Sequence, residues 1–99
     1  MTKKHRKNRK HLNWIHEFEC IVKHDCFGGL QAHHLMRPFI GDRGMGMKSS
    51  DENVIPLCWK HHNELHAITE VKFFLKYFDD EDYGKEQALK FWLMSPFRK

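Results

Sequence analysis

The chain has 99 residues, room for one small domain, and its 40% of hydrophobic residues include eight phenylalanines and three tryptophans, which argues against a wholly disordered chain. Three cysteines, an odd number, argue against a secreted disulfide framework and favour reduced thiols or metal ligation in a cytoplasmic protein. No apolar run is long enough to span a membrane and the N-terminus lacks the apolar core of a signal peptide, so a membrane partner is not expected.

Positive charge is concentrated at the N-terminus. The formal net charge is +4, and six of the first ten residues are lysine or arginine. We expect residues 1–8 to form a flexible basic tail. Such a block is typical of a solvated arm or of a segment that contacts phosphates, and charge alone does not decide between them. From Arg9 to Glu19 apolar residues recur at roughly helical spacing, which predicts a short amphipathic helix.

The next segment holds two thiols around a turn. Cys20 and Cys26 are separated by five residues, and the two glycines that follow Cys26 allow the backbone to reverse. A short strand over residues 30–32 is then expected to carry His33 and His34 at its end.

A long connection lies between Met36 and Asp51, in which glycine and proline recur too often for a helix. Loops of this length in a compact domain are usually functional or mobile. Its basic residues Arg37, Arg43 and Lys48 are candidate contacts to nucleic-acid phosphates, although basic residues are also ordinary in a surface loop.

The second half of the chain combines a strand with helices. The apolar run 53–57 predicts the returning strand of a hairpin, with Pro56 near its end. Helices are expected at 59–68, at 71–78 and at about 85–94. The sequence therefore predicts a single α+β domain over residues 9–99, with a core at 20–68 and a C-terminal helical extension at 69–99.

Two pairs of potential metal ligands lie on and just before the helix predicted at 59–68. A helix advances about 100° per residue, so Cys58 shares a face with His61, and His62 shares a face with His66. The two pairs point about a quarter turn apart, so one ion is not expected to collect all four side chains. We expect two metal sites that share this helix.

The first expected set combines thiols with one imidazole in a closed tetrahedral site suited to structural Zn²⁺: Cys20, Cys26, Cys58 and His61. Two alternatives remain open. The cysteines could be small buried hydrophobic residues without a metal. His24 could replace Cys20 or Cys26, because their spacing is wider than the usual two-residue knuckle.

The second expected set contains only histidines: His33, His62 and His66. Three imidazoles leave a divalent ion with open positions for a phosphate oxygen and a water molecule. His34 follows His33 at the strand end and could lie across the bound phosphate. A neutral imidazole there can take a proton from water, because its ordinary pKa of about 6.5 is close to working pH.

These residues resemble a known motif. His34, Asn53 and His62, in this order, with a histidine directly before the first and another four residues after the last, resemble the HNH nuclease motif of the ββα-metal superfamily. The run from Asn53 to Cys58 is similar to the zinc-stapled branch of that superfamily. Further segments are similar to small phage and prophage HNH proteins: Ala32-His33-His34-Leu35, Gly44-Met45-Gly46 and Phe91-Trp92. The resemblance covers residues 12–66 closely and the C-terminal third loosely.

The resemblance implies a role for each matching residue. His34 would be the general base, and Asn53 would brace the loop that holds it in orientation. The ligands of the catalytic ion would be His33, His62 and His66. The implied fold is a ββα-metal, treble-clef-like core with structural zinc, an N-terminal helix and C-terminal helices, which makes 9–99 a single HNH nuclease domain. His61 stands where this family often has a second downstream cysteine.

The implied activity is metal-dependent hydrolysis of DNA phosphodiester bonds to 5′-phosphate and 3′-hydroxyl ends. Mg²⁺, Mn²⁺, Ni²⁺ and Zn²⁺ are candidate catalytic ions. The expected setting is the cytoplasm of a bacterial host, as a monomer, with DNA and a phage packaging or recombination protein as partners. Two alternatives are a non-catalytic, zinc-stabilised module that binds nucleic acid through the basic arm, and a small secreted protein with disulfide bonds.

Overall fold

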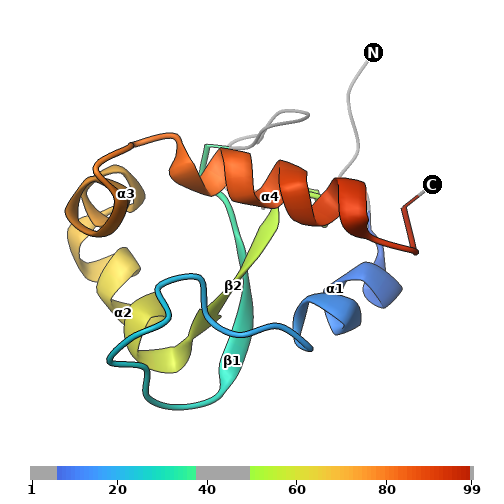
Figure 1. The fold of residues 1–99 in the computed structure, drawn as a ribbon, viewed down its shortest axis with the longest axis horizontal. Coiled ribbons are helices and arrows are strands. Elements are labelled where there is room, and N and C mark those ends of the chain that lie inside the picture. The colour runs from blue at the N-terminus through green and yellow to red at the C-terminus, as the bar shows by residue number, and fades with distance from the viewer. Residues whose placement is uncertain (1–6, 38–49, 99) are drawn as a thin grey trace.

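A computed structural model describes residues 7–37 and 50–98. The described chain is an α+β fold with one two-stranded antiparallel sheet. Its elements are α1 (Arg9–Ile15), β1 (Leu30–His34), β2 (Val54–Cys58), α2 (Trp59–Ile68), α3 (Glu70–Phe78) and α4 (Tyr83–Met94). In Figure 1 the hairpin of β1 and β2 runs through the middle, with α2 and α3 on one side, α1 on the other and α4 crossing over it.

The hairpin has a fixed register in which Ala32 pairs with Pro56 and His34 with Val54. Pro56 was expected near the strand end, and this expectation is wrong: it occupies the middle of β2. The proline is tolerated because its position in the ladder turns its backbone away from β1, and its carbonyl instead accepts the backbone N–H of Ile21 at 3.1 Å. This bond fastens the segment after Cys20 to the outer edge of β2.

Helices α1, α2 and α3 each begin at a residue whose side chain caps the helix. Cys58 ends β2 and is also the N-cap of α2, with its sulfur accepting the backbone N–H of His61. Thr69, at φ 85°, interrupts the helix between α2 and α3. Asp79, at φ 56°, ends α3 in a left-handed conformation. The helix predicted at 59–68 is confirmed with the same bounds.

The first helix differs from its prediction at both ends. Asn8 was placed in the flexible tail, but it is the N-cap of α1, and its side chain accepts the backbone N–H of His11. The helix stops at Ile15 rather than Glu19, because the following N–H groups bond carbonyls only three residues back. That tighter turn carries Phe18 onto Phe91 of α4, with ring centroids 5.1 Å apart.

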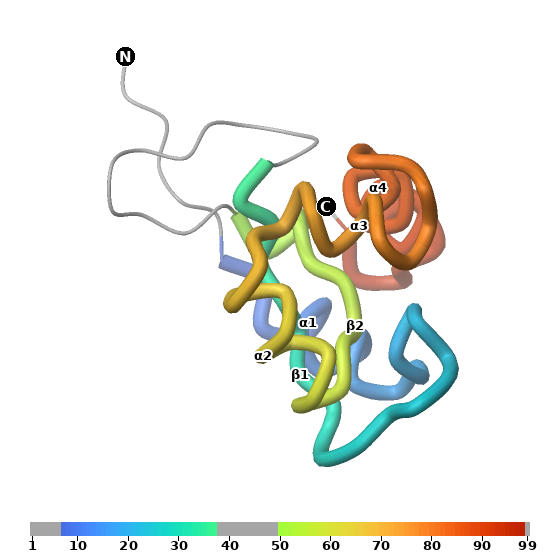
Figure 2. The backbone as a smooth tube through the Cα atoms, turned by 90° about the vertical axis from the view of Figure 1, so that its left-hand side faces the viewer, coloured from blue at the N-terminus to red at the C-terminus, as the bar shows by residue number. Residues whose placement is uncertain are grey.

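The core lies between the hairpin and the helices around it. α2 contacts both strands, whereas α1 and α4 contact β2. Figure 2, seen from the side that carries α2, shows α2 in front of the hairpin and α1 behind it. The largest fully buried apolar side chains come from α1, from the segment directly after β1, and from β2, α2 and α3: Ile15, Leu35, Ile55, Leu57, Leu65, Phe73 and Phe74. Among the described residues, none of the helices has the length and apolar character needed to cross a bilayer.

Candidate metal centres

The structure gathers the four side chains of the thiol-rich set around the N-terminus of α2: Cys20, Cys26, Cys58 and His61. We call this group the Cys₃His cluster. The Nδ1 atom of His61 lies 3.1, 3.6 and 3.8 Å from the sulfurs of Cys58, Cys20 and Cys26. Tetrahedral zinc would separate a nitrogen and a sulfur ligand by about 3.5 Å. The donor set and its spacing therefore fit a metal ion, zinc being the best match.

Ionisation of the three thiols also points to a cation. Desolvation raises the pKa of the Cys26 thiol to about 12, and the neighbouring sulfurs of Cys20 and Cys58 act in the same direction. Burial opposes ionisation of Cys58, but backbone N–H groups of His61 and Phe27 favour its thiolate, and its pKa is lowered. Three sulfurs this close cannot all ionise unless a positive charge lies among them.

The turn before β1 presents these thiols. Lys23 and Asp25 have positive φ angles of 68° and 54°, and Gly28 has a φ of 88°, so the chain reverses tightly around Cys26. A Cβ at Gly28 would lie 2.5 Å from the Cβ of Trp59, which shows how closely the turn approaches α2. All three cysteines are free thiols. His24, the alternative ligand, lies outside the cluster and faces Asp25 at 3.5 Å.

The second expected set also converges: His33 of β1 with His62 and His66 of α2. We call it the His₃ cluster. Nε2 of His62 lies 3.1 Å from both Nδ1 of His33 and Nε2 of His66. Two nitrogen ligands of a tetrahedral ion would lie about 3.3 Å apart. Burial lowers the pKa of His62 to about 4, and the two neighbouring rings act in the same direction, so its imidazole is neutral and suited to bind a cation.

The outward nitrogens of two of these rings are held by residues that the sequence analysis did not single out. Nε2 of His33 donates to Oε1 of Glu70 at 3.0 Å, and Nδ1 of His62 donates to Oε1 of Gln31. Such partners fix the ring tautomer, so that the other nitrogen faces the ion. Gln31 lies two residues before His33 on one face of β1, a spacing that could have revealed it. Glu70 had no such signal, because only the fold brings it to His33.

Glu70 is a buried carboxylate at the start of α3, only 4% exposed. Besides His33 it accepts the backbone N–H groups of Met36 and Arg37, at 2.8 and 3.1 Å. Burial opposes its charge, but these three donors outweigh that effect and lower its pKa. The carboxylate therefore stays ionised beside the His₃ cluster and ties α3 to the end of β1.

His34, the expected general base, is paired with an acid. Its Nε2 atom lies 2.7 Å from Oδ1 of Asp51, whose other oxygen accepts the backbone N–H of Asn8 at 2.7 Å. Asn53 is fully buried, its side chain donates to the carbonyl of Ser50, and its own carbonyl accepts the N–H of Leu35. Asn53 thus joins the turn that carries Asp51 to the end of β1.

Of the three basic residues expected to contact phosphates, the structure describes Arg37. Arg37 forms an ion pair with Asp82 at 3.0 Å and also donates to the carbonyl of Glu81. This arginine therefore joins the end of β1 to the start of α4. Arg43 and Lys48 lie outside the described residues.

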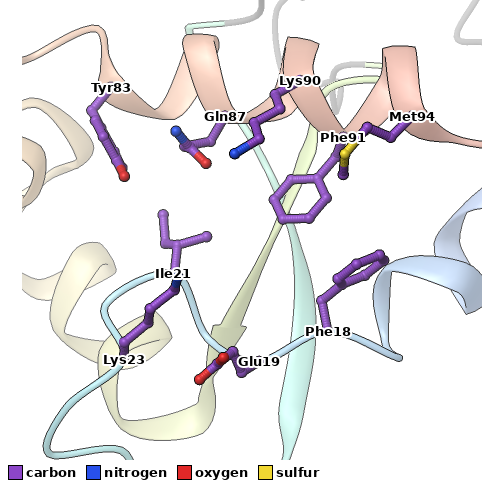
Figure 3. Close-up of a pocket in the computed structure, with 9 residues that line it drawn as sticks. All are labelled: Phe18, Glu19, Ile21, Lys23, Tyr83, Gln87, Lys90, Phe91 and Met94. Atoms are coloured by element: carbon purple, nitrogen blue, oxygen red, sulfur yellow. The ribbon is translucent and has the colours of Figure 1, made fainter.

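Among the clefts formed by described residues, two bear on where the candidate site lies. One, of about 330 Å³, opens between residues 18–23 and α4 and has Phe18, Ile21 and Phe91 in its walls. Figure 3 shows Lys23 and Glu19 on one side of it and Lys90 and Gln87 on the other, with no histidine among its lining residues. The other, of about 470 Å³, has His34 and Asp51 on one side and α1 on the other.

The fold and the two clusters define a small α+β protein with two candidate metal sites, built on one hairpin and one helix. The chain belongs to the family described as "Protein of unknown function (DUF968)", whose model matches residues 2–93. It is similar to the "Uncharacterized protein YdfU" of Escherichia coli (strain K12), with 38% identity over 84 residues. That match covers 83% of this chain and 20% of YdfU, so the chain spans about a fifth of that relative's length. No solved structure matches.

Proposed function

We propose that this chain is a metal-dependent DNA endonuclease of the HNH type, with a ββα-metal core formed by β1, β2 and α2. The observation that carries the proposal is the convergence of His33, His62 and His66 on one point, one residue away from His34. The three ring nitrogens lie within 4.8 Å of one another, and lone pairs so placed repel unless a cation or a proton lies between them.

The His₃ cluster would hold the catalytic ion. When bound, a divalent ion polarises the scissile phosphate and stabilises the charge that develops on the leaving 3′ oxygen. Glu70 and Gln31 keep the rings of His33 and His62 in the tautomers that turn a lone pair toward the ion. Three protein ligands leave positions for substrate, which distinguishes this cluster from the closed Cys₃His cluster.

His34 would activate the attacking water. Because a carboxylate can only accept, the neutral ring donates from Nε2 to Asp51, and Nδ1 carries the lone pair that takes a proton. The imidazolium that forms is stabilised by the same carboxylate, 2.7 Å away. Asn53 would hold the turn that keeps Asp51 and the end of β1 together.

The Cys₃His cluster would hold a structural zinc ion. It joins the turn that contains Cys20 and Cys26 to the first turn of α2, and the same helix carries His62 and His66. A domain of this size has a limited core, so a metal at this junction would add rigidity where the catalytic ligands need it.

The test is plasmid nicking by protein whose catalytic ion has been removed, with Mg²⁺, Mn²⁺, Ni²⁺ or Zn²⁺ added back. His34→Ala should lose at least about 100-fold in rate while the metal content is kept, because general-base catalysis contributes about 10²–10⁴-fold. His62→Ala should lose both metal at the His₃ cluster and cleavage. The exposed His24 is the matched control, and His24→Ala should cleave normally. Wild-type protein that binds DNA but never cuts it with any ion would favour the non-catalytic binding module.

A further inference from the structure

One face of α1, exposed and polar except for the half-buried Leu12, is turned toward the cleft that contains His34. Positions 9, 12, 13 and 16 recur at the spacing of a single helix face, and all four side chains line the cleft: Arg9, Leu12, Asn13 and His16. The opposite face is buried through His11 and Ile15. The helix therefore has a definite orientation, with one face in the core and the other beside the expected general base.

The described residues that line this cleft include two cations. Lys7 and Arg9 line it, both are exposed, and neither has a carboxylate partner among the described residues. Among the described lining residues the acidic one is Asp51, and its two oxygens already accept from the His34 ring and from the backbone N–H of Asn8. The negative charge of Asp51 is thus engaged, whereas the two cations are directed to solvent.

The position of α1 beside His34 is fixed by Asn8. Its backbone N–H bonds Asp51, its side-chain oxygen caps α1, and its side-chain N–H₂ donates to the carbonyl of Phe97 at 2.9 Å. One residue therefore connects the start of α1, the partner of His34 and the segment after α4. The basic face is part of the folded domain, at a set distance from the site.

We propose that this face of α1 binds the sugar–phosphate backbone of the DNA strand that flanks the phosphate to be cleaved, with Lys7 and Arg9 contacting phosphates and Asn13 donating from its amide. This inference rests on the proposed function and adds the residues that hold the substrate. The seven residues of α1, Arg9 to Ile15, extend about 10 Å along the helix axis, and one strand of a duplex has a phosphate every 3.4 Å or so along its axis. The face is therefore long enough for about three consecutive phosphates.

The experiment compares two double variants that remove the same charge. Lys7→Gln/Arg9→Gln changes the α1 face, and Lys72→Gln/Lys90→Gln changes two exposed lysines on α3 and α4. Both are made in the 99-residue chain carrying His34→Ala, so that the DNA stays intact. Binding of a fluorescently labelled duplex is measured by anisotropy over a series of salt concentrations, and cleavage is measured in the variants that keep His34.

Each phosphate contact contributes about 0.9 to the magnitude of the slope of log affinity against log salt concentration. Loss of one contact therefore lowers the affinity about fivefold at about 0.15 M salt. We expect Lys7→Gln/Arg9→Gln to bind about 30-fold more weakly, with a slope smaller by about 2, and the control pair to bind nearly as the parent does. Equal losses in both pairs, or no loss in either, would overturn the proposal. If wild-type protein never cleaves but this pattern of binding holds, the α1 face is supported and the nuclease proposal fails.

Discussion

Replacing Glu70 by glutamine keeps the shape of the side chain and removes its charge. The carboxylate takes three donors, with His33 and Met36 on Oε1 and Arg37 on Oε2. Glutamine has one oxygen, so Glu70→Gln leaves an N–H₂ group facing at least one backbone N–H in a site that is only 4% exposed. A buried donor without a partner costs about 1–3 kcal/mol, which is the destabilisation we expect for this variant.

The same substitution should weaken the His₃ cluster specifically. Without the charged acceptor at Nε2, the His33 ring loses its fixed tautomer and part of its basicity, and loss of such a partner typically lowers metal affinity about 10–100-fold. The assay is calorimetric titration of Ni²⁺ into protein whose Cys₃His cluster is filled with zinc, together with urea unfolding. Glu64→Gln, a partly buried carboxylate bonded to Tyr77, is the control and should leave Ni²⁺ affinity unchanged. Unchanged affinity and stability in Glu70→Gln would refute the assigned role of this carboxylate.

Three further predictions concern stability. Burial lowers the pKa of His11 to about 4, against a smaller opposing effect of Asp51. The unfolded chain therefore binds the proton more readily than the folded chain, and the free energy of unfolding should fall by about 3 kcal/mol as the pH drops from about 6.5 towards 4. In His11→Phe this part of the pH dependence should disappear from urea unfolding curves. A methyl group at Gly84 would lie 2.5 Å from the Phe74 ring, so Gly84→Ala should lose about 1–3 kcal/mol in thermal unfolding, whereas Gly29→Ala, with nothing within 4 Å, should change stability by less than about 0.5 kcal/mol. Chelation of zinc should lower the melting temperature followed by circular dichroism, and zinc added back should restore it; a melting curve indifferent to the chelator would count against a structural metal.

Local spacing predicted the helix 59–68 and both candidate ligand sets, because the candidate ligands on and just before α2 are related by helix geometry alone. A period of 3.6 residues places Cys58 with His61, and His62 with His66, whatever else the chain does. The hairpin then needs only to bring Cys20, Cys26 and His33 to the same helix. The sequence spacing alone therefore assigns these side chains to two separate sites.

Long-range contacts were not predictable in this way. Glu70 and His33 are 37 residues apart in sequence, and Asp51 and His34 are 17 apart, with no shared period to join them. The position of Pro56 was misjudged, because proline usually marks a strand end unless its missing N–H would point away from the neighbouring strand. The ion pair of Arg37 with Asp82 was likewise not predictable, because Asp82 belongs to an acidic run 45 residues further along the chain.

The ten-residue helix α2 carries candidate ligands of both clusters on adjacent faces. Ordering of this helix by one ion reduces the entropy lost when the second ion binds, so filling either site should promote filling of the other, and by thermodynamic reciprocity the enhancement is the same in both directions. Cys26 is the exposed member of the thiol set, and its oxidation would remove one ligand. Oxidation of the Cys26 sulfur would therefore also lower the metal affinity of the His₃ cluster, which lies on the adjacent face of the same helix.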